Sequence, residues 1–162
     1  MRMRDPRPLI RGFFEQIGLE VREAVLEGPT FVPGIRLEQG AILYDPQKLQ
    51  YPGDLLHEAG HVAFTPGSER PELSDHLATT PGDEMAAIAW SYAAAVHIGL
   101  SLSIVFHEGG YRGESAALIS NFEAGRFVGV SMLDWAGMTT LPHPRQPHTP
   151  GMFPEMKTWL RD

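Results

Sequence analysis

The amino-acid sequence predicts an α+β fold in which an N-terminal helix and a small antiparallel sheet precede a mostly helical remainder. Apolar residues recur with helical spacing over residues 6–27, short strand-like runs fill residues 31–44, and two strongly apolar helical stretches follow. The 162 residues are 43% hydrophobic and 20% charged, which is typical of a folded globular protein. We therefore expect a single domain over residues 1–162, with a proline-rich tail at about 141–162.

The N-terminal helix is predicted by its amphipathic pattern. Gly28 and Pro29 mark its expected end. We expect this helix to support the core and to carry no chemistry. Its apolar positions, three or four residues apart, are Ile10, Phe13, Phe14, Ile17, Val21 and Val25.

The sheet is predicted from three short apolar-rich runs at residues 31–32, 35–38 and 41–44. Pro33-Gly34 and Gln39-Gly40 separate them, and such pairs are typical of turns. We expect two or three antiparallel strands at this point in the chain.

Composition limits the kinds of partner. The chain has no cysteine, so disulfides and thiolate metal sites are excluded. Its 20 acidic and 13 basic residues give a formal net charge of -7, which argues against a nucleic-acid or anionic-membrane binder. The sequence shows neither a signal-peptide-like apolar run nor a stretch of transmembrane length. We expect a cytoplasmic protein with no nucleic-acid and no membrane partner.

The segment His57-Glu58-Ala59-Gly60-His61 has the H-E-x-x-H spacing of a metal site. Residues four apart lie on one face of a helix, so His57 and His61 can direct their imidazoles at one metal ion. Glu58 is displaced around the helix, where it can reach a metal-bound water and act as a base. The alternative is two surface histidines that happen to flank a glutamate. The apolar flanks favour a packed helix and therefore the metal site.

Glu84 is the candidate third ligand. Thr80, Pro81 and Asp83 form a helix start, and Glu84 opens the strongly apolar helix that follows. A buried carboxylate is costly unless a cation compensates it, so ligation is favoured over a role for Glu84 as a solvent-exposed partner of the helix dipole. His76, in the preceding loop, is a weaker candidate ligand. Two histidines and one glutamate would leave a fourth position open, as in a catalytic Zn²⁺ site.

These residues resemble the gluzincin class of zinc metallopeptidases. The segment Asp54-Leu55-Leu56-His57-Glu58-Ala59-Gly60-His61, followed by Asp83-Glu84-Met85-Ala86-Ala87, is similar to the compact minigluzincins and to ImmA/IrrE-type proteins over about residues 35–98. The resemblance implies a zincin-like fold with a helix and a small sheet before the motif. It also implies that an edge strand beside the cleft can hold an extended peptide. Residues 41–44 are the candidate for that edge, and an ordinary sheet edge without a peptide remains equally open.

The resemblance further implies peptide-bond hydrolysis by a zinc-bound water, with Glu58 as the general base. Gluzincins often carry an acidic residue four places after the glutamate ligand, where it braces the first histidine. Ile88 stands at that place here, so the brace must come from elsewhere or be weaker.

A hydrogen-bond donor for the developing oxyanion is expected in the glycine-rich segment at residues 107–113. His107 and Tyr111 are the candidates there, and Tyr92 on the Glu84 helix is a further one. The glycine-rich segment itself can be a mobile loop over the site.

The C-terminal half is predicted to form helices at 114–123 and 130–136. Met132, Leu133 and Trp135 are expected in the core. In the tail, prolines keep residues 141–150 extended, so His143 and His148 are expected in solvent rather than on a metal. The apolar residues near 152–160 are expected to dock on the core or on a second subunit.

Three functions are weighed. The leading one is a small zinc-dependent peptidase acting on a peptide or protein substrate. The second is a zinc-binding protein of the same fold that regulates or binds a partner with weak or no turnover. The third is a structural metal site, which would have no use for Glu58 beside its ligand.

Overall fold

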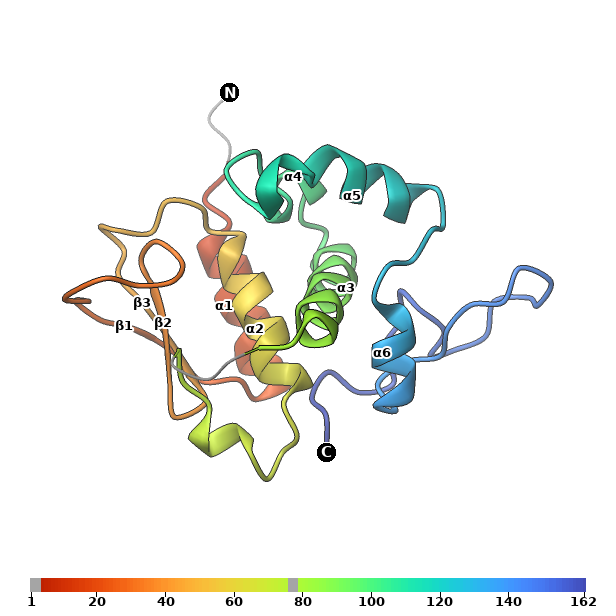
Figure 1. Cartoon of the computed structure of the whole chain (residues 1–162), viewed down its shortest axis with the longest axis horizontal. Coiled ribbons are helices and arrows are strands. Elements are labelled where there is room, and N and C mark those ends of the chain that lie inside the picture. The colour runs from red at the N-terminus through yellow and green to blue at the C-terminus, as the bar shows by residue number, and fades with distance from the viewer. Residues whose placement is uncertain (1–3, 76–78) are drawn as a thin grey trace.

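The fold is α+β, as the sequence predicts. The structure is a computed structural model that describes residues 4–75 and 79–162 (Figure 1). Within these residues it contains six α-helices and one three-stranded sheet. In chain order the elements are α1 (Arg7–Ile17), β1 (Val21–Glu23), β2 (Ile35–Glu38), β3 (Ala41–Tyr44), α2 (Asp54–Phe64), the short 3-10 helix η1 (Arg70–Glu72), α3 (Pro81–Ile98), α4 (Leu102–Val105), the 3-10 helix η2 (Tyr111–Gly113), α5 (Ser115–Glu123) and α6 (Val130–Trp135).

Helix α1 is shorter than the predicted helix over residues 6–27. It ends at Ile17 because Gly18 adopts a left-handed conformation, with φ of 84°, and its N–H bonds back to the helix. The chain then forms strand β1, and Val25, expected on the buried face, is 84% exposed. The helical spacing of apolar residues therefore continued by chance beyond the glycine that stops the helix.

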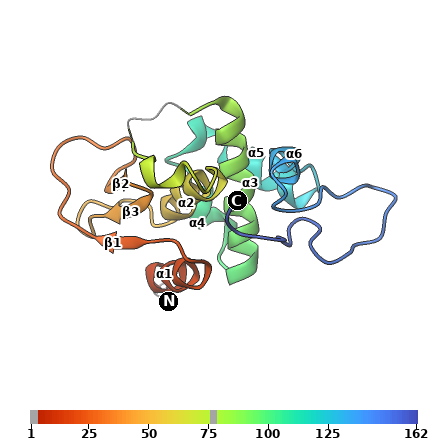
Figure 2. The same ribbon diagram turned by 90° about the horizontal axis from the view of Figure 1, so that it is seen from below.

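The sheet is mixed rather than purely antiparallel. Strand β1 runs parallel to β3, whereas β2 is antiparallel to β3, and the order across the sheet is β1-β3-β2. The prediction that residues 41–44 form the edge is wrong, since β3 is central and all four of its residues are buried. Val32 forms only an isolated bridge to Ile35. Figure 2 shows β1 on the side of α1 and β2 on the opposite side of the sheet.

The core lies around α2 and α3, which pack closely against each other (Figure 1). At their crossing, a Cβ built on Gly60 would lie 2.8 Å from the Ala87 carbonyl oxygen and 2.9 Å from the Ala87 Cα. Gly60 is therefore required by close packing and is not merely tolerated. The largest fully buried side chains around this crossing include Trp90, Phe14, Leu55 and Leu56.

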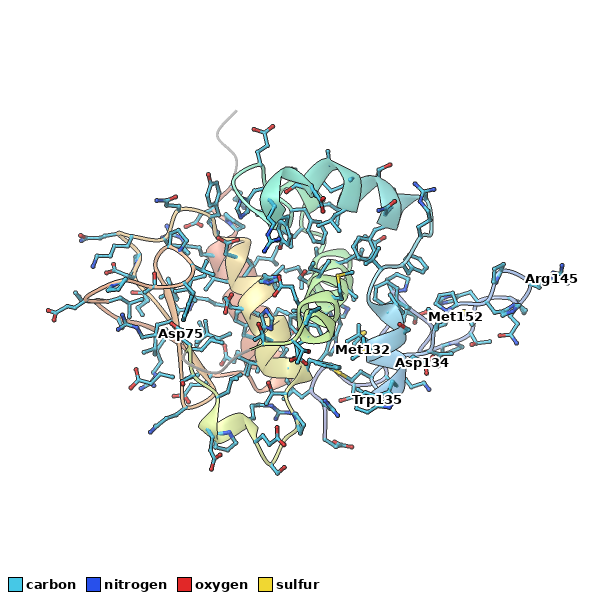
Figure 3. All side chains as sticks on the ribbon, viewed as in Figure 1. Asp75, Met132, Asp134, Trp135, Arg145 and Met152 are labelled. Carbon is cyan, nitrogen blue, oxygen red and sulfur yellow. The ribbon has the colours of Figure 1, made fainter. Side chains whose placement is uncertain are left out.

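The predicted helices of the C-terminal half are present as α5 and α6. Leu133 is buried as expected and Met132 is half-buried, but the prediction of a core position for Trp135 is wrong because its side chain is 70% exposed. The Arg161 guanidinium instead covers the Trp135 ring at 4.9 Å and the Phe64 ring at 5.0 Å. Figure 3 shows Met132, Asp134 and Trp135 together on α6.

The last residues dock on the core of the same chain. Trp159 packs edge-on against Trp90 and Phe13, and the Trp90 indole N–H donates to the Trp159 carbonyl oxygen at 3.0 Å. The Arg161 N–H donates to the Ala63 carbonyl oxygen in α2 at 2.9 Å. Between α6 and these anchors the proline-rich tail projects from the body, with Arg145 at its tip (Figures 1 and 3). Over residues 4–75 and 79–162, every helix falls short of the length or the apolar character needed to cross a membrane.

The helix crossing makes a matched pair of alanine substitutions informative. Gly60→Ala should lower the free energy of unfolding by about 1–3 kcal/mol, because the new methyl group overlaps the Ala87 backbone. A Cβ at Gly12 in α1 meets no atom within 4 Å, so Gly12→Ala should raise the free energy of unfolding by up to about 1 kcal/mol through helix propensity. Urea denaturation of both variants measures the difference. Equal effects would contradict the close crossing of α2 and α3.

Candidate metal centre

Helix α2 brings the two histidines of the motif to one face. The rings of His57 and His61 lie edge to face with centroids 4.9 Å apart, and their side chains are only 13% and 10% exposed. The helix has this orientation because its other faces carry the buried residues Leu55, Leu56 and Val62. The ligand atoms of His57, Glu58 and His61 lie within 4.8 Å of one another, close enough to hold a metal ion.

Glu84 joins the two histidines from the first turn of α3. Its Oε1 lies 2.9 Å from His57 Nε2 and its Oε2 lies 2.9 Å from His61 Nε2. Ligand atoms about 2.0–2.1 Å from a tetrahedral Zn²⁺ are roughly 3.3 Å from one another, so this spacing needs little change to admit a cation. The Glu84 carboxylate thus spans the two imidazoles, with one oxygen beside each Nε2.

The start of α3 fixes where Glu84 stands. Thr80 Oγ1 accepts a hydrogen bond from the Asp83 N–H at 3.1 Å, and Asp83 Oδ2 accepts one from the Thr80 N–H at 2.9 Å. This reciprocal capping box, with Pro81 at the first helical position, is the helix start that the sequence predicts. Asp83 serves the cap, which leaves Glu84 to face the histidines.

The protonation states of the three groups depend on one another. Hydrogen bonds from His57 and His61 hold the pKa of Glu84 well below its usual range, so Glu84 is ionised. Burial alone would lower the pKa of His57, but its hydrogen bond to Glu84 and the charges of Glu84, Glu58 and Asp54 raise it above its ordinary value. The ionised Glu84 carboxylate therefore favours positive charge beside the two imidazoles.

Glu58 has a different environment from Glu84. Burial raises the pKa of Glu58, and the charges of Asp75 and Glu84 raise it further, against the opposing effect of the two histidines. A carboxylate with a raised pKa holds a proton more readily, as a general acid–base group requires. Glu84 is not the buried carboxylate that the sequence predicts, because 44% of its side chain is exposed.

The first histidine lacks the brace that an acidic residue at position 88 would give. Ile88 is buried at that position, and His57 Nδ1 is buried with no hydrogen-bond partner among the residues that the structure describes. Metal-binding histidines usually donate this second N–H to a carboxylate, a carbonyl or water. The imidazole of His57 is instead held by packing, including an edge-to-face contact with Tyr111 at 5.6 Å.

Tyr111, in the glycine-rich segment, contacts the candidate metal centre through the His57 ring. Its hydroxyl is buried and has no hydrogen-bond partner in the described part of the chain. Burial raises the pKa of Tyr111, and the charges of Asp54, Glu84 and Glu58 add to this effect, so the hydroxyl keeps its proton. Tyr111 and Arg112 both have positive φ, at 57° and 54°, a strained conformation that concentrates at functional sites.

His107 comes to the same region but is held differently. Its Nε2 lies 2.6 Å from Asp54 Oδ1, and its ring stacks on Tyr51 with centroids 3.7 Å apart. The other ring nitrogen, Nδ1, is buried and without a partner among the described residues. Because Asp54 lies in the first turn of α2, the His107–Asp54 pair ties the glycine-rich segment to the helix that carries the motif.

The remaining histidine and tyrosine candidates do not meet at the centre. Tyr92 stacks on Phe122 at 4.3 Å and on Phe153 at 5.8 Å, so it is part of an aromatic core cluster. His143 and His148 are exposed, as the sequence predicts. His76 lies outside the described residues.

The sequence does not single out two carboxylates near the site. Asp54 lies three residues before His57, and this helical spacing places it on the same face. Asp75, whose charge reaches Glu58, lies in an irregular segment where no sequence pattern could predict its neighbours.

The chain matches no protein-family model, and comparisons with curated proteins and with solved structures found no match.

Proposed function

We propose that this protein is a small zinc-dependent peptidase of the gluzincin type, with a zincin-like arrangement of the sheet and the two central helices. The single observation that carries the proposal is the approach of both Glu84 oxygens to the two Nε2 atoms, each at 2.9 Å. His57, His61 and Glu84 would hold the metal, and a peptide or protein would be the substrate.

The donor set suits Zn²⁺. Two imidazole nitrogens and one carboxylate oxygen are ligands that Zn²⁺ accepts in catalytic sites, and the chain has no cysteine to complete a thiolate site. A structural site would gain nothing from Glu58, a half-buried carboxylate next to the first ligand. The presence of Glu58 therefore favours catalysis over a structural role for the metal.

Each residue has a defined part in the proposed reaction. A bound Zn²⁺ supplies a Lewis acid that polarises the peptide carbonyl and acidifies water. The Glu58 carboxylate accepts a proton from the attacking water and returns it to the leaving nitrogen, as its raised pKa allows. The Tyr111 hydroxyl, protonated and without another partner in the described structure, donates a hydrogen bond to the carbonyl oxygen as negative charge develops there.

His107 is assigned to positioning rather than to the oxyanion. Its Nε2 is engaged by Asp54 and its Nδ1 is buried, so no ring nitrogen is left for a substrate. The His107–Asp54 pair instead holds the segment that presents Tyr111.

A second candidate is a zinc-binding regulatory protein with weak turnover. The unpartnered Nδ1 of His57 favours it, because loss of such a brace typically costs 10–100-fold in metal affinity or activity. A screen against a peptide library separates the two functions, since only the peptidase yields cleavage products.

The metal assignment predicts the zinc content of three variants. Purified protein should contain about one zinc per chain by elemental analysis. His57→Ala and Glu84→Ala should each weaken zinc binding by more than about 100-fold, because each removes a ligand. His143→Ala, which removes an exposed histidine of the tail, is the control and should retain zinc. Retention of zinc by Glu84→Ala would show that another group is the third ligand.

Glu58→Gln should keep zinc and lower kcat for peptide cleavage by about 10²–10⁴-fold, since glutamine cannot accept the proton. Cleavage of a fluorogenic peptide measures the rate. Glu15→Gln makes the same change on an exposed position of α1 and should leave the rate unaltered. Undiminished turnover by Glu58→Gln would remove the general base from the mechanism.

Tyr111→Phe removes only the hydroxyl and should lower kcat by about 10²–10³-fold with little change in KM. Tyr92→Phe is the matched control, because Tyr92 packs among core aromatics away from the metal centre. Zinc content and thermal unfolding should be unchanged in both variants. A rise in KM with an unchanged kcat would assign Tyr111 to substrate binding instead.

A further inference from the structure

A cavity of about 530 Å³ lies along the outer edge of β2. Strand β2 contributes Leu37 and Glu38 to its lining, the preceding connection contributes Phe31, and the segment after η1 contributes Asp75. Figure 3 shows Asp75 beside the sheet. The charge of Asp75 also contributes to the raised pKa of Glu58.

Asp75 forms a fixed wall of the cavity. Its Oδ1 accepts a hydrogen bond from the Leu37 N–H at 2.9 Å, and its N–H donates to the Leu37 carbonyl oxygen at 3.2 Å. These two bonds engage the outward-facing backbone groups of Leu37 in the edge strand. The carboxylate is therefore held in place before any ligand binds, which reduces the entropy cost of binding.

The cavity combines an exposed aromatic ring with unpaired carboxylates. Phe31 is 80% exposed at its rim, which is unusual for so large an apolar side chain. Glu38 and Asp75 form no ion pair with any cation that the structure describes. The lining also includes Arg36, whose guanidinium is engaged by the Glu27 carbonyl oxygen at 2.7 Å.

We propose that this cavity is a subsite for a lysine or arginine side chain of an extended peptide, with the cation between Glu38 and Asp75 and the aliphatic stem on Phe31. The proposal rests on the proposed peptidase function and adds the substrate class. An aromatic face attracts a nearby cation and also packs against a methylene chain, so Phe31 serves both parts of such a side chain. The formal net charge of -7 also favours a basic peptide over an acidic one.

The carboxylates distinguish this occupant from others. An acidic side chain would meet two like charges, with only Arg36 to offset them. A purely apolar side chain would cover Phe31 but leave the charges of Glu38 and Asp75 without a compensating cation. A basic side chain satisfies both groups at once.

Binding of three matched peptides tests the assignment. The probe is the labelled heptapeptide Gly-Ser-Ala-X-Ala-Ser-Gly, in which X is lysine, norleucine or glutamate. Fluorescence anisotropy with the full-length Glu58→Gln protein measures binding without consuming the peptide. The lysine peptide should bind about tenfold more tightly than the nearly isosteric norleucine peptide, as two partly exposed ion pairs and a cation–π contact allow. The glutamate peptide should bind most weakly.

Three substitutions locate the effect. Glu38→Gln and Asp75→Asn remove the charges, and asparagine at position 75 keeps an oxygen for the Leu37 N–H. Combined, they should abolish the preference for lysine over norleucine. Phe31→Ala should weaken the binding of both the lysine and the norleucine peptide. Glu15→Gln, an exposed charge change on α1, is the control and should retain the full preference.

The proposal is overturned if lysine and norleucine peptides bind equally, if the glutamate peptide binds best, if no peptide binds, or if the double variant keeps the lysine preference. Cleavage of a lysine-containing peptide by the wild-type protein is measured separately. A lysine preference in binding without cleavage by the wild-type protein would reject the peptidase and retain the basic subsite.

Discussion

The close contact between α2 and α3 is the constraint on which the rest of the site depends. At Gly60 the α2 backbone approaches Ala87 so closely that no side chain fits between them. This contact is made one residue from His61 and three residues from Glu84, so it sets the distance between the histidine face of one helix and the carboxylate of the other. Other small residues of α3, among them Ala86, Ala89 and Ala93, are also fully buried in the core where the two helices pack.

The surroundings of Glu58 and Glu84 shift the pKa values of these two carboxyl groups in opposite directions. Partial burial raises the pKa of Glu58, whereas Glu84 accepts hydrogen bonds from both imidazoles, which lower its pKa and keep it ionised. Such divergence between neighbouring carboxyl groups is how one site can provide both a fixed anion and a proton carrier. The tyrosine of the glycine-rich segment completes the arrangement with a hydroxyl that no described residue engages.

Much of the centre could be predicted because its signals are local. The spacing of His57 and His61 and the cap at Thr80 each depend on a few adjacent residues, and both helices lie where these patterns indicate. Features that depend on tertiary contacts were not predictable in this way. The N-terminal helix stopped early at Gly18, Ala41–Tyr44 became the central strand through a parallel pairing with β1, and Trp135 was left exposed under Arg161. The link between Asp54 and His107 joins residues far apart in the sequence, and no single segment reveals it.

The docking of the last residues on the core has a consequence for the stability of the centre. Arg161 bonds to Ala63 and Phe64 at the end of α2, and Trp159 packs against Trp90 in α3. These contacts join residues far apart in the chain, so each closes a long loop and must offset the entropy of that loop. The packing of the two helices that bear the histidines and the glutamate therefore includes contributions from the last residues of the chain, which lie far from both helices in the sequence.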